Sequence, residues 1–182
     1  DAGIGLHTAL LGGGQRAEAD KLAADWQREQ PKDVAFRYYL GDMALSRAEL
    51  PAAEAHYRAV LELQPRNALA MNNIAWLLAR QGKPGAVAMA EQANALMPDR
   101  APLLDTLATA LAAEKQLPKA IETQKRAIQR NPQDPGLQLN LARLYIQSGD
   151  KAQARGELDA LAKLGDKFRG QAEVATLLKT VQ

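Results

Sequence analysis

The chain contains no cysteine, which excludes disulfide bonds and thiolate metal sites within its 182 residues. Aromatic residues make up only 4% of the sequence, and together with abundant alanine and leucine this favours closely packed helices over a sheet. No apolar run approaches the roughly 20 residues of a bilayer-spanning helix, so we expect no membrane insertion by this segment. The chain begins without an initiator methionine or a signal-peptide pattern, and we expect it to be a piece of a longer protein.

An excess of charge of one sign is also missing. The 23 Lys and Arg residues against 21 Asp and Glu residues leave a net charge of +2, too little for a strong field over a phosphate backbone or an anionic membrane. We therefore expect no nucleic-acid partner.

A sequence segment that ends in proline recurs along the chain, at Pro31, Pro65, Pro98 and Pro132, with intervals of 34, 33 and 34 residues. Alanine stands twelve residues before each of these prolines, and the series continues once more: Ala19, Ala53, Ala86, Ala120 and Ala154. A second series sets a leucine or isoleucine before a mostly small residue, in the pairs Leu6–His7, Leu40–Gly41, Ile74–Ala75, Leu107–Ala108 and Leu141–Ala142. Several residue types that keep one period indicate an internal repeat.

Apolar residues at intervals of three and four predict two helices of about a dozen residues in each unit. The breakers GGGQ, RAEL, QGKPG, EKQL and SGDK separate the two helices, and Pro51 and Pro118 fit the first turn of a second helix. The unit-ending prolines stop that helix. Alanine where two helices cross lets their axes approach to the short end of about 8 to 10 Å. Because one hairpin cannot bury its apolar faces alone, we expect each to stack on the next.

The unit VAFRYYLGDMALSRAELPAAEAHYRAVLELQP resembles the tetratricopeptide repeat, through Leu40, Gly41, Ala53, Tyr57, Leu63 and Pro65. The resemblance implies an all-α fold, a right-handed superhelical solenoid of about five helical hairpins with a C-terminal capping helix, as one domain over 1–182. The implied units are about 2–33, 34–66, 67–100, 101–134 and 135–166, with the cap at about 167–182. The first unit matches least, because His7 and Trp26 replace small residues and Glu29 takes an apolar place.

A narrower resemblance rests on LDALAKLGDKFRGQAEVATLLK, which follows NNIAWLLARQGKPGAVAMAEQANALMPDRAPLLDTLATAL. The two stretches are similar to the C-terminal end of large bacterial repeat lipoproteins that accompany PEP-CTERM protein-sorting and exopolysaccharide systems. This resemblance implies an extracytoplasmic, periplasmic protein, lipid-anchored through upstream sequence. The residues themselves leave the compartment and the oligomeric state open.

Residue patterns for catalysis are missing from the chain. His7 and His56 are too few and too far apart in sequence to predict a metal site or a base with its orienting partner. GIGLHT lacks the third glycine of a dinucleotide fingerprint, and GGGQR lacks the Gly-Lys-Ser/Thr of a phosphate loop. We therefore predict no enzyme, no catalytic residue, no metal and no cofactor.

The family resemblance implies that the first helix of each unit lines a concave groove that holds a peptide or a partner helix. Carried over to this sequence, the partner-binding residues are Tyr38, Asp42, Asn72, Asn73, Trp76, Arg80, Asp105, Thr109, Asn140 and Arg143, and Tyr39, Ser46, Thr106 and Gln147 lie on the same expected face. Trp76 is the expected anchor, because a large ring in a groove is a common interface hot spot. Asn73 and Asn140 match an asparagine ladder that grips peptide backbones, although Tyr39 and Thr106 break it.

The interpretation that follows is a protein–protein interaction scaffold with a protein or peptide ligand of unknown identity. Two alternatives stay open. The chain could be the substrate-recruiting arm of a larger enzyme, which its full-length reading frame would reveal. It could also be an RNA-binding helical repeat, but that function needs paired polar residues at fixed places in every unit and a basic path for phosphates.

Overall fold

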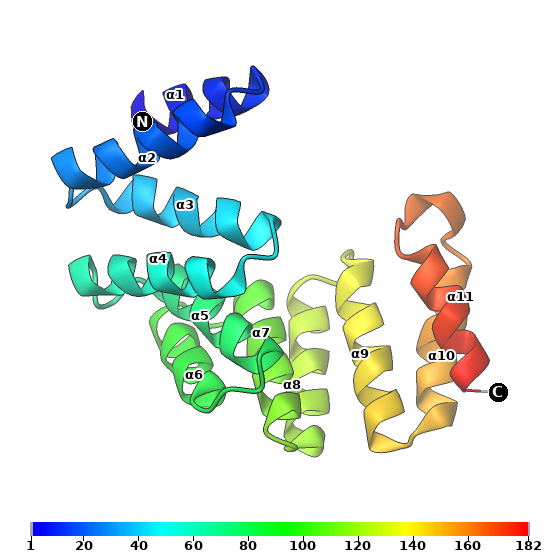
Figure 1. The fold of residues 1–182 in the computed structure, drawn as a ribbon. Coiled ribbons are helices and arrows are strands. Elements are labelled where there is room, and N and C mark those ends of the chain that lie inside the picture. The colour runs from blue at the N-terminus through cyan, green and yellow to red at the C-terminus, as the bar shows by residue number, and fades with distance from the viewer. Residues whose placement is uncertain (1, 182) are drawn as a thin grey trace. The chain divides into compact units, whose positions relative to one another are not determined.

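A computed structural model describes residues 2–181, which form eleven α-helices and one 3-10 turn and contain no strand (Figure 1). The helices are α1 (Ala2–Gly12), α2 (Arg16–Glu29), α3 (Val34–Ser46), α4 (Leu50–Leu63), α5 (Ala68–Arg80), α6 (Ala86–Leu96), α7 (Ala101–Ala113), α8 (Leu117–Arg130), α9 (Pro135–Ser148), α10 (Lys151–Ala162) and α11 (Gln171–Thr180). The predicted all-α class is confirmed. None of the described helices combines the length and the apolar character needed to cross a bilayer.

The chain divides into two compact units, Asp1–Ile74 and Ala75–Gln182, and the division falls within α5. In both units the residues that mark the repeat in the sequence lie where helices begin and end. The four unit-ending prolines each stand two residues after a helix ends, after Glu29, Leu63, Leu96 and Arg130. Pro51 and Pro118 lie in the first turns of α4 and α8. Aspartate side chains cap the starts of α3, α9 and α10 by accepting backbone N–H groups.

The repeated small positions are the buried ones. Ala19, Ala53, Ala86, Ala120 and Ala154 are all at most 1% exposed, as the crossing argument requires. The residue that follows the leucine or isoleucine mark is also buried in all five repeats. The Leu/Ile mark itself departs from this burial once, because Leu6 is 52% exposed whereas Leu40 and Leu141 are buried.

An aromatic cluster holds the first hairpin of unit 1. The ring of Trp26 lies 5.6 Å from that of Phe36, and His7 meets Phe36 and Tyr39 edge to face. Gly3 makes room for this packing, since a Cβ there would come within 2.6 Å of the Trp26 ring. His7 and Trp26, which replace the small residues of the family pattern, are therefore both packed within this cluster. The large rings fill the space that small residues close elsewhere. Glu29 is exposed at the end of α2.

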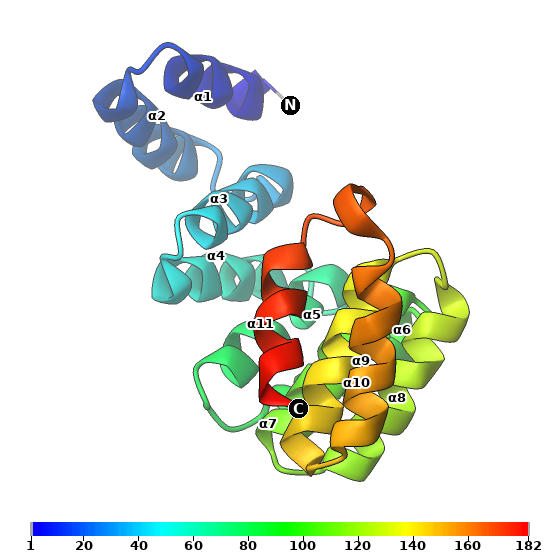
Figure 2. The ribbon, with the colours of Figure 1, turned by 90° about the vertical axis from the view of Figure 1, so that its right-hand side faces the viewer.

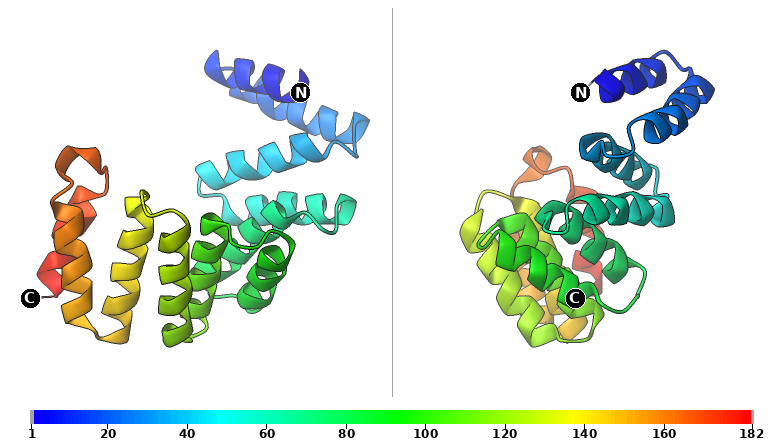
Figure 3. Two further views of the ribbon diagram at one scale, coloured as in Figure 1. Left: turned by 180° about the vertical axis from the view of Figure 1, so that it is seen from behind. Right: turned by 90° about the vertical axis from the view of Figure 1, so that its left-hand side faces the viewer.

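In unit 2, consecutive helices from α6 to α11 contact one another, and Figure 3 shows α8, α9 and α10 side by side in chain order. The last core joins Leu158 and Leu161 of α10 to Val174 of α11 and to Val181. Figure 2 shows α11 lying against α10. The segment from Gly165 to Lys167 is a 3-10 turn, so the helix of the expected cap begins at Gln171, and residue 182 lies outside the described residues.

Candidate partner-binding groove

A cavity of about 630 Å³ opens on unit 2, lined by residues of five helices, α5, α7, α8, α9 and α11. Six residues predicted from the sequence line it: Trp76, Arg80, Asp105, Thr109, Asn140 and Arg143. Gln147, expected on the same face, also contributes. The first helices α5, α7 and α9 supply these side chains because the repeat returns the same helix face to the same side. The structure thus brings the unit 2 part of the predicted set together.

A chain of polar contacts forms one wall of this cavity. Asp105 Oδ1 accepts from Gln124 Nε2 at 2.7 Å and from Asn140 Nδ2 at 2.8 Å. Arg143 donates to Asn140 Oδ1 and holds Glu173 with two bonds, Nε to Oε1 at 2.8 Å and Nη2 to Oε2 at 2.7 Å. The contacts tie α7, α8, α9 and α11 together, so the wall is fixed before any partner arrives.

This wall changes what the predicted residues have to offer a partner. Asn140 already uses one N–H and one oxygen lone pair, which leaves it one N–H and one lone pair. The guanidinium charge of Arg143 is matched by Glu173. Asp105 accepts from two amides, and no cation among the described residues pairs with it.

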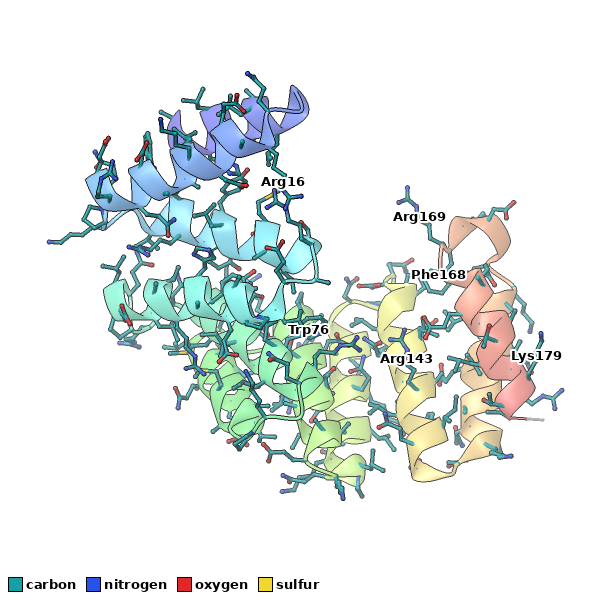
Figure 4. The ribbon with its side chains drawn as sticks, in the orientation of Figure 1. Arg16, Trp76, Arg143, Phe168, Arg169 and Lys179 are labelled. Carbon is teal, nitrogen blue, oxygen red and sulfur yellow. The ribbon has the colours of Figure 1, made fainter. Side chains whose placement is uncertain are left out.

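Trp76 and Arg80 stand apart from that wall. The Arg80 guanidinium carbon lies 5.5 Å from the centroid of the half-buried Trp76 ring, one helical turn away on α5 (Trp76 and Arg143 are labelled in Figure 4). Arg80 is exposed and makes no ion pair with the described residues. A cation over an aromatic face is worth about 0.5 to 1 kcal/mol at exposed sites, enough to orient Arg80 while its charge stays accessible.

The predicted residues of unit 1 form a separate cluster. Asn73 Nδ2 donates to the Tyr38 hydroxyl at 2.9 Å, and the Tyr57 hydroxyl donates to Asp42 Oδ1 at 2.6 Å. Burial, followed by the Asp42 charge, raises the pKa of Tyr38. Burial and the bond to Asp42 raise the pKa of Tyr57 as well, so both phenols keep their protons at neutral pH. Asn72 is half-buried, and its Oδ1 has no hydrogen-bond partner among the described residues.

Three further residues expected on the groove face are engaged within the chain itself. Thr106 is buried at 4% exposure, so its side chain belongs to the core and not to the groove face. Tyr39 bonds His7 Nδ1 through its hydroxyl at 2.8 Å and packs in the aromatic cluster. Ser46 is exposed and turns its hydroxyl to the carbonyl of Met43.

Two polar residues of the cavity were missed from the sequence, Gln124 and Glu173. Gln124 sits on the buried face of α8, where its repeat equivalents are Tyr57, Ala90 and Leu158. A glutamine at a core position that carries no amide in those other repeats could have been singled out from the sequence. Glu173 lies on α11, outside the repeat pattern, and nothing in the sequence indicated which residue it faces. Among the described residues, no group of three His, Asp or Glu side chains is placed to hold a metal ion.

The stacked hairpins and the groove on the first helices define a helical repeat protein of the interaction-scaffold class. Two family models described as tetratricopeptide repeat match this sequence, at residues 6–63 and 45–102 for one and 111–179 for the other. The chain belongs to the tetratricopeptide repeat family, whose fold is that of a protein-interaction scaffold.

Individual relatives are more distant. Cellulose synthase operon protein C of Pseudomonas fluorescens (strain SBW25) is 26% identical over 159 residues, which cover 82% of this chain and 12% of that protein. The chain therefore spans about an eighth of that relative's length. MamA from residue 41 to its end, from Desulfovibrio magneticus RS-1, superposes with a TM-score of 0.77 at 20% identity, covering 92% of this chain and 96% of that one. PilW, a type IV pilus biogenesis factor, gives a TM-score of 0.77 at 19% identity over 99% of this chain and 89% of its own. These two likenesses concern the fold alone.

Proposed function

We propose that this chain binds a protein partner by holding an extended peptide segment in the unit 2 groove. The observation that carries the proposal is the pairing of Trp76 with Arg80 at the edge of the cavity. A large ring next to a guanidinium without an ion pair is the composition that interface hot spots favour.

The groove also indicates the chemistry of the segment. Since Arg143 is paired with Glu173, the cation left to attract a partner from this cavity is Arg80. The segment therefore carries a carboxylate for Arg80 and an apolar side chain that lies on Trp76. Asn140 has one N–H and one lone pair left for the peptide backbone, so it assists binding without dominating it.

A random peptide library displayed on phage, panned against the full chain, tests the proposal. Enriched peptides are titrated by isothermal calorimetry, a readout that does not depend on Trp76 and therefore applies equally to the parent chain and to every variant. Trp76→Ala should weaken binding about 30-fold, the equivalent of about 2 kcal/mol for a hot-spot ring. Arg80→Ala should weaken binding and remove its dependence on salt, since a rim charge acts through the screened field.

Leu69→Ala is the matched control, since Leu69 is an exposed residue of the same helix that does not line the cavity. Circular dichroism should show that all three variants keep the helical fold. Peptides that bind Trp76→Ala and Arg80→Ala as tightly as the parent chain would show that the groove is not the binding site.

We further propose that the scaffold works in a bacterial envelope system that makes or exports an exopolysaccharide. The similarity to cellulose synthase operon protein C supports this setting, and so does the resemblance of the C-terminal half to repeat lipoproteins. An extracytoplasmic location, with lipid anchoring through upstream sequence, belongs to the same proposal. Osmotic-shock fractionation of cells that express the full-length gene tests it: the protein should travel with the envelope, and recovery with the cytoplasm would contradict the setting.

A further inference from the structure

The first helix carries an apolar stripe that faces solvent. Ala2, Leu6 and Ala9 follow one another by about one helical turn on one face of α1, and all three are exposed. Leu6 is 52% exposed, the highest fraction among the large apolar side chains described as exposed. Figure 1 shows α1 as the outermost helix of unit 1.

The same three positions are covered in every later first helix. The equivalents are Phe36, Leu40 and Met43 in α3; Ala70, Ile74 and Leu77 in α5; Leu103, Leu107 and Ala110 in α7; and Leu137, Leu141 and Leu144 in α9. All twelve are buried or half-buried. The exposure of the α1 stripe is therefore a departure from the burial that the four later first helices show at these positions.

Where both helices lie within one of the two compact units, the second helix of the preceding repeat covers these positions. On α3, Phe36 and Leu40 pack against Ala23 and Trp26 of α2. On α9, Leu137 packs against Ala127 of α8, and Leu144 packs against Ala120. Gln124 of α8 also donates to the Leu137 carbonyl at 2.9 Å. One kind of helix, with alanine-sized residues at its crossing, thus covers this stripe.

We propose that the face of α1 formed by Ala2, Leu6 and Ala9 docks a further helix of this second-helix type, so that α1 is an internal element of a longer stack. A stack that ends in solvent needs a polar outer face. The helix α11 has one, because it buries Val174 and exposes Thr176 and Lys179, whereas the α1 stripe is entirely apolar. That polar face also disfavours α11 of a second copy as the occupant of the stripe.

The proposal is tested by giving the chain the missing helix. Residues 101–135 are duplicated and joined in front of Asp1, which places a copy of α8 before α1 in the register that α8 keeps before α9. Hydrogen exchange of the α1 amides, followed by mass spectrometry, should be at least ten-fold slower in the extended chain than in the 182-residue chain. Leu6→Glu should abolish this added protection, because it places a charge in the new contact.

Leu69→Glu is the matched control, since Leu69 is 48% exposed on an internal first helix but lies outside the stripe. It should leave the added protection in place. Equal exchange of α1 in the original and extended chains would overturn the proposal. Sedimentation of the 182-residue chain as a dimer that Leu6→Glu dissociates would overturn it too, because a second copy would then cover the stripe.

Discussion

Three glycine-to-alanine substitutions, identical in chemistry, should change stability in three different ways. Gly156 lies within α10 and is exposed, and a Cβ there meets nothing within 4 Å. Gly149 ends α9 with a φ of 81°, also with open space around its Cβ position. Gly41 lies where α3 crosses α4, and a Cβ there would come within 2.6 Å of the Tyr57 ring.

The magnitudes follow from what each site demands. Gly156→Ala should raise the free energy of unfolding by about 1 kcal/mol, the difference in helix propensity between the two residues. Gly149→Ala should lower it by about 0.5 to 1 kcal/mol, because the left-handed conformation costs about 1 to 2 kcal/mol and the stiffer unfolded chain returns part of that. Gly41→Ala should cost more than about 2 kcal/mol, since the fully buried Tyr57 ring cannot move aside without straining its neighbours.

Urea denaturation followed by circular dichroism measures the three changes, and thermal melts repeat them at about 2 to 4 °C per kcal/mol. The sign of the Gly149 and Gly156 variants is the sharp part of the test, because space is open at both sites and the backbone φ angle is the difference between them. Stabilisation by Gly149→Ala, or a silent Gly41→Ala, would refute the turn geometry or the crossing geometry from which these values come.

Two further predictions concern the core and pH. Ala120→Glu should cost more than about 4 kcal/mol by burying an unpaired charge at a fully buried crossing, whereas Ala160→Glu on the exposed side of α10 should be nearly silent; a melting temperature unchanged by Ala120→Glu would contradict the alignment of the repeats. Burial, then the charge of a nearby arginine, lowers the pKa of His7 and of His56 below the ordinary 6.5. At these pH values the unfolded chain therefore binds more protons than the folded chain. The free energy of unfolding should fall as pH drops from about 7.5 through 6.5. Urea midpoints of the parent chain and a His7→Gln, His56→Gln double variant check this, and an equal pH slope in both would count against it.

The repeat made most of the fold predictable. A buried helix crossing admits only small residues, so the recurring alanines indicated where helices cross. All five alanines are buried. Leu6 was the exception for a reason the period cannot express. In the later repeats the equivalent position is buried, with the second helix of the preceding repeat against it. No described residue supplies such a helix for α1.

The turns between the paired helices show where sequence reasoning lost detail. Gly14, Ala48, Gly82, Lys115 and Gly149 occupy one repeat position, and all have positive φ, from 59° to 81°. Three glycines marked the left-handed turn, but Ala48 and Lys115 adopt it without the residue that signals it. The rest of the repeat imposes the conformation at those two sites.

For the groove, the face was predictable and the connections on it were not. Helix periodicity placed six of the predicted residues around one cavity, since each first helix presents the same side. Which polar groups would pair depended on contacts across helices that no spacing encodes. The bidentate bond from Arg143 to Glu173 is the clearest case, because its acceptor lies outside the repeats.

That bond decides how substitutions in the groove should be interpreted. Removing Arg143 would release α11 through Glu173 and free Asn140 from one partner, so a loss of binding in that variant would mix recognition with a change in the wall. Trp76 and Arg80 have no such connection to the wall, since their described contact is with each other on one helix. In the proposed mode of binding, a partner gains its specificity mainly from α5, while the polar wall keeps the receptor side ordered and lowers the entropy lost on docking. On this proposal, effects at Trp76 and Arg80 should report recognition directly, and effects at Asp105, Asn140 and Arg143 should report how firmly the surface that presents them is held.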